Sequence, residues 1–174
     1  VLPTSGNPYP FSEGFESLSD LNGNDWFSNS FDQDNEWQIS STTSYSGSKS
    51  VMINNFSNTQ STKDELFSPI IDLTGTNNLA ITFKYAFAKK DSSNTDQLQL
   101  LVSNNCNNTW TSRLNLTGTN LETAPITTNS FSPVSSSEWK SGYATIPNTY
   151  LNSSFRMKFI YTSKGGNNIY LDDI

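Results

Sequence analysis

The carboxylate side chains are the residues of this chain with the clearest capacity for chemistry, and they occur at a few places in the sequence. Three of them alternate in the segment Asp32-Gln33-Asp34-Asn35-Glu36, and segment 20–25 offers side-chain oxygens around Gly23. Ca²⁺ takes about six to eight oxygen ligands from carboxylates, amides and the backbone, so both spacings suit a calcium loop. Neither segment completes an EF-hand. Acids of solvent-exposed turns remain the alternative interpretation.

The adjacent pair Asp172-Asp173 closes the last apolar stretch of the chain. In a strand, successive side chains point to opposite faces. If Ile169 and Leu171 face inward, Asp173 follows them; if the other face is buried, Asp172 shares it with Tyr170. Either register brings one carboxylate toward the interior, where it needs a cation or several hydrogen-bond donors. A bound metal ion is the simplest way to meet that need.

The chain lacks the residues that most kinds of catalysis require. The chain has no His, so it has no Ser-His-Asp triad and no His-ligated zinc. Its one Cys, Cys106, lies in the Asn-rich turn 104–108 and has neither a His partner nor a second Cys for an intrachain disulfide. No compact carboxylate pair of the glycosidase kind is present. We therefore expect a chain that is not an enzyme.

The charge balance and the hydropathy pattern exclude two classes of partner. Sixteen acidic residues against 10 basic ones give a formal charge of −6, and no basic stripe is present. This argues against nucleic acid and anionic membranes. No apolar run approaches the roughly 18 residues of a membrane span, so we expect no membrane insertion.

The four tryptophans are the candidate residues for stacking on sugar rings: Trp26, Trp37, Trp110 and Trp139. For each of them, packing in the core or at a strand edge is the alternative. Two or three coplanar exposed aromatic rings would favour a sugar ligand. Flat polar faces and contacts made by loops would favour a protein or surface ligand.

The elements that must position these residues are strands. Apolar side chains alternate with polar ones, the period of a half-buried strand, at 79–87, 97–103 and 154–161. This period predicts a core that includes Phe83, Tyr85, Leu98, Leu100, Val102, Met157 and Phe159. Further strands are predicted at 48–54, 66–71, 110–114, 139–146 and 168–174. Strands with one solvent-exposed face are typical of a β-sandwich, and we expect a jelly roll here.

Composition agrees with an all-β, loop-rich domain. Asn, Ser and Thr supply 69 of the 174 residues, and these types disfavour helices. The length predicts a single domain over 1–174, with residues 1–10 as an extended lead-in and 115–137 as a long surface loop. Because the chain begins at Val1, we expect a domain excised from a longer protein. The small neutral polar residues and the near absence of Cys suit a secreted bacterial protein.

Four stretches, taken in order, carry a family resemblance. They are an opening Phe-Glu motif, a strand with Ser-Pro and Asp-Leu, a stretch with Cys and Trp, and a terminal Asp-Asp-Ile strand: Gly14–Ser17, Asp64–Leu73, Asp96–Trp110 and Ile169–Ile174. Together they resemble motifs of MAM-like jelly rolls, above all the bacterial cleaved-adhesin and choice-of-anchor J domains. The turn around Cys106 departs from the family pattern because it lacks the usual acid and Gly, which weakens a binding role for that turn.

The resemblance implies a jelly-roll β-sandwich of the concanavalin-like or MAM-like kind, secreted or surface-attached, often with a structural Ca²⁺. It places the metal ligands at Glu16, Asp64, Asp172 and Asp173. The segment with Asp32, Asp34 and Glu36, which resembles the acidic turn of cleaved-adhesin domains, is the second, weaker candidate. In a jelly roll the first and last strands commonly run side by side, which would let these acids meet.

Two functional hypotheses follow. The first is a non-catalytic accessory or adhesion module of a secreted or cell-surface bacterial protein, beside a protease for example, stabilised by calcium. The alternative is a carbohydrate-binding module of a polysaccharide-degrading enzyme. The expected partner is a host or cell-surface protein or a glycan, and the module itself is expected to be monomeric.

Overall fold

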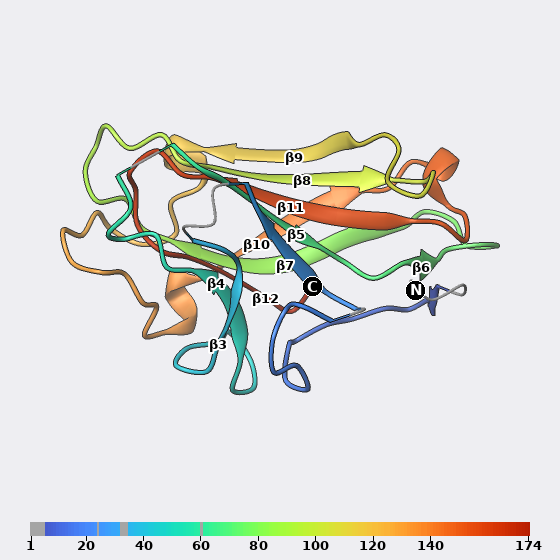
Figure 1. Cartoon of the computed structure of the whole chain (residues 1–174), viewed down its shortest axis with the longest axis horizontal. Coiled ribbons are helices and arrows are strands. Elements are labelled where there is room, and N and C mark those ends of the chain that lie inside the picture. The colour runs from blue at the N-terminus through green and yellow to red at the C-terminus, as the bar shows by residue number, and fades with distance from the viewer. Residues whose placement is uncertain (1–5, 24, 32–34, 60) are drawn as a thin grey trace.

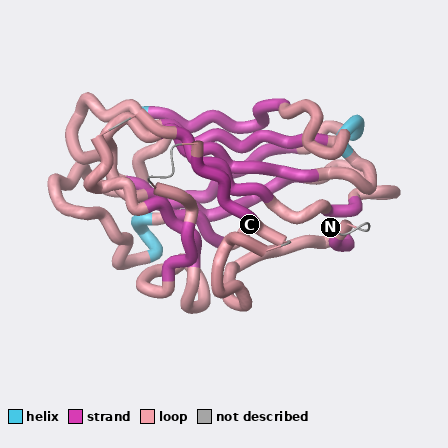
Figure 2. Tube along the Cα trace, viewed as in Figure 1, coloured by secondary structure: helices cyan, strands magenta, loops and turns pink. Residues whose placement is uncertain are grey.

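The chain folds into two stacked β-sheets (Figure 1). A computed structural model describes residues 6–23, 25–31, 35–59 and 61–174. Within these residues every pairing in the two sheets is antiparallel, and one short parallel pair joins β1 (Asn7–Pro8) to β6 (Ile71–Asp72). Most of the strands run along the long axis of the molecule, and much of the irregular structure lies at its two ends (Figure 2).

The first sheet, called the β7 sheet below, has the order β10-β7-β12-β4-β3. Its strands come from both halves of the chain, and the last strand, β12, lies between β4 and β7. Their bounds are Lys140–Thr145 (β10), Ala80–Phe87 (β7), Ile169–Asp172 (β12), Ser50–Ile53 (β4) and Gln38–Ser40 (β3).

The second sheet, called the β11 sheet below, has the order β2-β5-β11-β8-β9. Its central strand β11 pairs with β5 on one side and β8 on the other. The bounds are Phe27–Ser30 (β2), Lys63–Phe67 (β5), Arg156–Thr162 (β11), Gln97–Ser103 (β8) and Thr111–Thr117 (β9).

The alternating residues form the core between the sheets, as predicted. All seven residues expected in the core are buried: Phe83, Tyr85, Leu98, Leu100, Val102, Met157 and Phe159. The rings of Phe83 and Phe159 meet edge to face at 4.8 Å, which joins the β7 sheet to the β11 sheet. The all-β sandwich predicted from the period of two is confirmed.

The predicted strand ends differ from the observed ones where backbone hydrogen bonding stops. The segment predicted as one strand over 66–71 divides into β5 and β6, because Pro69 has no N–H to donate. The short strands β2 and β3 were not predicted, since a run of three or four residues is too short for a period to be recognised.

The long segment after β9 covers the outer face of the β7 sheet. It contains two single-turn 3-10 helices, Gly118–Asn120 and Ser136–Glu138, and a third one, Asn148–Tyr150, follows β10. Its apolar side chains form a second small core with residues of β7 and β12: Ala86, Ala88, Ala124, Phe131, Trp139 and Tyr170. No helix among the described residues is long and apolar enough to cross a membrane.

Candidate functional site

Carboxylates from both ends of the chain contact the connection between β3 and β4 at residues 44–49, called the 44–49 turn below. Glu16 comes from the opening segment, and its Oε1 accepts hydrogen bonds from the backbone N–H groups of Ser48 (2.9 Å) and Lys49 (2.8 Å). Its Oε2 accepts one from the Ser48 hydroxyl at 2.7 Å. The turn bends at Gly47 with φ +61°, and a Cβ there would overlap the Glu16 carboxylate. The turn therefore needs glycine at this position.

The two terminal acids reach the same turn. Asp172 is fully buried, and its Oδ2 accepts hydrogen bonds from the N–H groups of Tyr45 (2.7 Å) and Ser46 (3.2 Å). Asp173 Oδ1 accepts one from the Ser46 hydroxyl at 2.7 Å. Asp173 has φ +47°, so regular alternation ends there. Ile169 and Leu171 face the main core, which is the first of the two registers that the sequence left open. Asp173 does not follow them inward, and the fully buried carboxylate is that of Asp172, on the other face of the strand with Tyr170.

These contacts join the first and last segments of the chain. The N–H of Glu13 donates to the carbonyl oxygen of Ile174 at 2.7 Å, and the N–H of Ile174 donates to the carbonyl of Glu13 at 2.9 Å. In Figure 1 the blue opening segment runs beside the C-terminal end. Glu16 and Asp173 thus approach the 44–49 turn from two segments that pair with each other.

The pKa values of the two carboxylates that accept the most hydrogen bonds near this turn, Glu16 and Asp172, are shifted in opposite directions. Hydrogen bonds from Ser48, its hydroxyl first and then its backbone N–H, lower the pKa of Glu16 because they favour the charged form. Burial raises the pKa of Asp172, against three backbone hydrogen bonds and with a contribution from the nearby Asp173 charge. The turn thus holds one readily ionised carboxylate and one whose charge is unfavourable.

Asp64 does not belong to this turn. It lies on β5 in the other sheet, fully buried and directly opposite Tyr161 of β11, and its carbonyl oxygen accepts a hydrogen bond from Trp37 Nε1 at 3.2 Å. The expected set of four carboxylates is therefore divided between two places. Its separation follows from β5 pairing with β11, which places Asp64 on the inward face of the β11 sheet.

The second, weaker candidate lies mostly outside the described residues, which do not include Asp32 and Asp34. Glu36 is exposed, and it lines a hollow of about 220 Å³ together with Asp20 and Trp37. Among the described residues, no three acidic, His or Cys side chains stand close enough to hold a metal ion. A calcium ion at the 44–49 turn would therefore need backbone or hydroxyl oxygens beside its carboxylates.

The oxygen atoms at the 44–49 turn are nevertheless suitable ligands for a hard cation. Glu16, Asp172 and Asp173 supply carboxylate oxygens, and Ser46 and Ser48 supply hydroxyls, all of which are ligand types that Ca²⁺ accepts.

A row of aromatic and charged side chains lies on the outer face of the β11 sheet, and sequence reasoning missed it. The rings of Phe27 and Phe67 stack at 4.5 Å. The ammonium of Lys158 lies 5.0 Å from the Phe67 ring and 4.6 Å from that of Trp110, and it forms a 2.6 Å ion pair with Glu65. The outward residues of the alternating strands were the available signal for this row.

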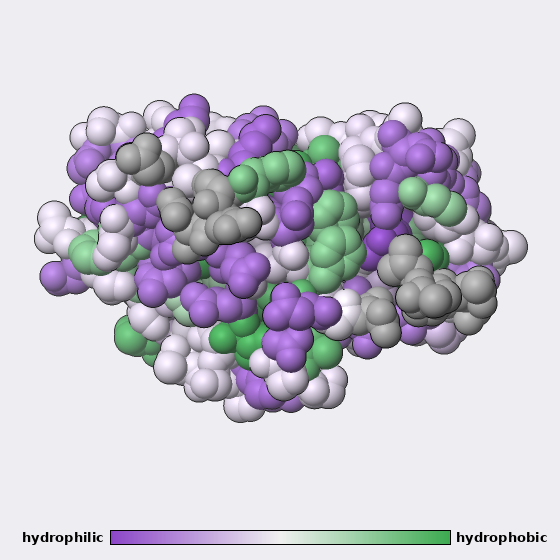
Figure 3. All heavy atoms as spheres, in the orientation of Figure 1, coloured by the Kyte–Doolittle hydropathy of each residue, from purple (hydrophilic) through white to green (hydrophobic). Residues whose placement is uncertain are grey.

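The tryptophans do not form a flat platform. Trp26, Trp37 and Trp139 are buried, as the core-packing alternative has it, and only Trp110 is half exposed. The Trp110 ring meets Phe67 at an interplanar angle of 70°. The face in Figure 3 is mostly hydrophilic or neutral, with small apolar patches.

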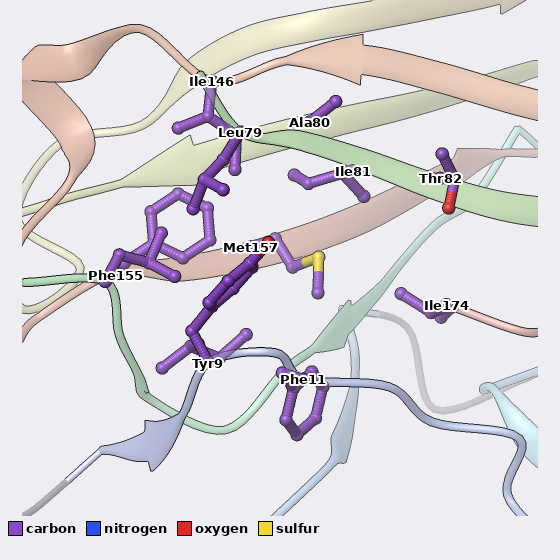
Figure 4. Close-up of a pocket in the computed structure, with 12 residues that line it drawn as sticks. Tyr9, Phe11, Leu79, Ala80, Ile81, Thr82, Ile146, Phe155, Met157 and Ile174 are labelled. Carbon is purple, nitrogen blue, oxygen red and sulfur yellow. The ribbon is translucent and has the colours of Figure 1, made fainter. Parts of the chain in front are cut away.

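An apolar pocket of about 100 Å³ opens between the two sheets near the start of the chain (Figure 4). Phe11, Phe155 and Met157 point into it, with Ile81 and Ile146 on the opposite wall. None of the described residues that line it is charged. Tyr9 is the titratable side chain among the described residues that line it.

Comparisons with known proteins agree with this architecture. No protein-family model matches the chain, and no curated protein sequence matches it. One similar solved structure is a cleaved adhesin domain of Lys-gingipain, at 20% identity and TM-score 0.64, covering 94% of this chain and 96% of that one. Another, from Porphyromonas gingivalis, has 17% identity, TM-score 0.62 and 94% coverage of both chains.

A carbohydrate-binding module solved with β-1,4-galactotriose is also similar, at 15% identity and TM-score 0.56, covering 92% of this chain and 90% of that one. At these identities the likeness concerns the fold: a β-sandwich like those of cleaved adhesin domains and carbohydrate-binding modules. These neighbours are themselves described as cleaved adhesin and carbohydrate-binding domains.

Proposed function

We propose that this chain is a non-catalytic adhesion or accessory module of a secreted or cell-surface bacterial protein, and that structural calcium stabilises it. The observation that carries the proposal is the meeting of Glu16, Asp172 and Asp173 at the 44–49 turn. Burial, and then the nearby Asp173 charge, disfavour the ionised form of Asp172, and a divalent cation would offset both effects. The similar cleaved adhesin folds support the adhesion function.

The distribution of exposed apolar side chains favours adhesion over sugar stacking. The exposed aromatic rings among the described residues lie on separate loops and strands: Tyr9, Phe31, Tyr45 and Tyr143. A sugar platform needs neighbouring rings in one plane, and these residues do not share one element. Contacts from loops and polar faces suit a protein or cell-surface partner.

Calcium at the turn would be held by the carboxylates of Glu16 and Asp173, with Asp172 behind them. The ion would supply positive charge and fixed geometry, since Ca²⁺ tolerates irregular ligand arrangements. It would also link the opening segment, the 44–49 turn and the last strand. Binding only to the folded state stabilises that state by mass action.

Thermal unfolding tests the calcium site. We expect calcium to raise the melting temperature of metal-free protein, magnesium to substitute poorly because it demands a stricter octahedron, and chelator to reverse the gain. Glu16→Ala and Asp173→Ala should each lose most of the calcium response. Asp72→Ala is the matched control, because Asp72 is a surface acid bonded only to Thr74 within its own turn. An unchanged melting curve after verified metal removal would contradict the site.

A specific observation favours glycan binding as the second candidate function. Phe27, Trp110 and the exposed Asn29 flank the Lys158–Glu65 ion pair on the outer face of the β11 sheet. Sugar-binding sites combine aromatic surfaces with a few oriented polar groups. The similar module that was solved with a galactotriose supports this candidate.

A glycan array with and without calcium separates the two candidates. If the β11 face binds sugar, β-1,4-galactan, xylan or mannan oligosaccharides should be retained, and Trp110→Ala should reduce retention at least tenfold. Tyr143→Ala serves as the control, because Tyr143 is a more exposed aromatic ring on the other sheet, the β7 sheet. If no glycan binds and the chain still adheres to cell-surface protein, the adhesion function stands and the second candidate fails.

A further inference from the structure

A second group of acidic and amide side chains is buried inside the sandwich, away from the 44–49 turn. Asp96 lies just before β8, Tyr161 near the end of β11, and Asn55 shortly after β4. Asp96 is 1% exposed, and the other two are fully buried. Asp64 lies directly opposite Tyr161, on the inward face of β5. This group is called the Tyr161 cluster.

One oxygen of Asp96 is fully used and the other is not. Oδ1 accepts hydrogen bonds from the Tyr161 hydroxyl (3.0 Å) and from the N–H groups of Lys164 (2.9 Å) and Gly166 (3.1 Å). Oδ1 therefore has three hydrogen-bond donors around it. Oδ2 is buried and accepts no hydrogen bond from the described residues. A buried charged oxygen without a partner is costly.

Asn55 shows the same imbalance. Its amide nitrogen lies 3.3 Å from the Tyr161 hydroxyl and 3.4 Å from the carbonyl oxygen of Asn167. Its amide oxygen Oδ1 is buried and accepts no hydrogen bond from the described residues. Asn55 and Asp96 are thus both hydrogen-bonded to the Tyr161 hydroxyl. Each also has a buried oxygen that accepts no hydrogen bond from the described residues.

The electrostatics of the Tyr161 cluster are negative. Burial, and then the charge of Asp96, hold the pKa of Tyr161 well above its usual value, and Asp64 adds to the effect. Asp96 and Asp64 therefore bring up to two negative charges to one part of the interior.

We infer that the Tyr161 cluster is a buried cation site that takes a hard divalent ion, calcium, with Asp96 Oδ2 and Asn55 Oδ1 as ligands. Asp64 adds negative charge beside Tyr161. Two buried oxygens that lack hydrogen-bond donors can serve as two of the oxygen ligands of a hard cation, whereas an apolar or anionic ligand would leave them unsatisfied. This site is independent of the 44–49 turn, with which it shares no residue.

Burial sets the kinetic behaviour of the Tyr161 cluster. Because its residues are at most 1% exposed, the ion can leave only when the sandwich opens. The ion at the 44–49 turn lies beside the exposed Glu16 and can leave without such opening. Bound metal should therefore be released in two phases, one fast and one limited by unfolding.

Metal content of the folded full chain tests the inference. Protein dialysed against calcium and then desalted is measured by mass spectrometry for calcium per chain. The site at the Tyr161 cluster predicts one equivalent that survives a brief incubation with chelator and is released in denaturant. Asp96→Asn should lose this equivalent, because asparagine keeps the acceptor at Oδ1 but places an amide nitrogen at Oδ2. Asn55→Ala should weaken it in the same way.

The controls separate this site from the other one. Glu16→Ala should lose only the fast equivalent, and Asp91→Asn, which changes a surface acid bonded to Ser93, should lose neither. Circular dichroism checks that each variant is folded. A wild-type chain with no chelator-resistant calcium would overturn the inference in favour of a buried water or proton. Retention of that calcium by a folded Asp96→Asn variant would overturn the ligand assignment.

Discussion

At the scale of single residues, the Asp96 carboxylate depends on the absence of a side chain at position 166. A Cβ on Gly166 would overlap this carboxylate. We expect Gly166→Ala to destabilise the fold by about 1–3 kcal/mol, the usual cost of overpacking. Gly23→Ala is the matched control, because nothing lies within 4 Å of a Cβ at that surface glycine. Urea unfolding of both variants measures the difference, and equal stabilities would contradict the close packing of Asp96 on Gly166.

At the scale of elements, the link between Glu16 and the 44–49 turn should make stability depend on pH. The pKa of Glu16 is lowered in the folded chain, so its contribution is present above the ordinary value of 4.5 and is lost as the pH falls through the folded value. In chelator, the wild type should therefore lose more stability than Glu16→Gln between pH 6 and pH 3. Parallel pH profiles of the two proteins would show that these hydrogen bonds do not stabilise the turn.

The segment that covers the β7 sheet is the second element open to test. Phe131 packs edge to face on Tyr170, and its backbone is held by Asn167 at the N–H and by Asn168 and Tyr170 at the carbonyl. We expect Phe131→Ala to loosen residues 121–139 and to speed their proteolysis, while melting of the sandwich changes less. The exposed Val134 gives the control Val134→Ala, which should be cleaved at the wild-type rate. Equal cleavage of both variants would argue against anchoring by Phe131.

At the scale of the whole molecule, the two sheets should unfold together. The contact between Phe83 and Phe159 joins them at the centre of the core, and Gly142 leaves room for the Phe83 ring. Phe83→Ala should cost about 3–5 kcal/mol, as for other buried aromatic residues. Far-UV circular dichroism and tryptophan fluorescence should still give coincident transitions. Separate transitions would mean that the sheets are independent units, and a loss within error would mean that Phe83 does not join them.

The sequence by itself determined the local structure. Period-two alternation identified β7, β8 and β11 and the seven core residues, because a strand's alternation depends only on neighbours in the chain. Glu16, Asp172 and Asp173 were proposed as metal ligands through a resemblance in their motifs, and their role as ligands remains a prediction. Short strands such as β2 and β3 escaped, since their pairing rather than their composition makes them strands.

Only the tertiary structure decided which side chains meet. Strand β12 lies between β4 and β7, and this pairing brings Asp172 and Asp173 to the 44–49 turn, where Glu16 also arrives. The pairing of β5 with β11 places Asp64 in the Tyr161 cluster instead, beside Asp96 and Asn55, which no sequence pattern connected. The physical reason is that strand order depends on how both sheets close over one core, and contacts between residues far apart in the sequence leave no local period.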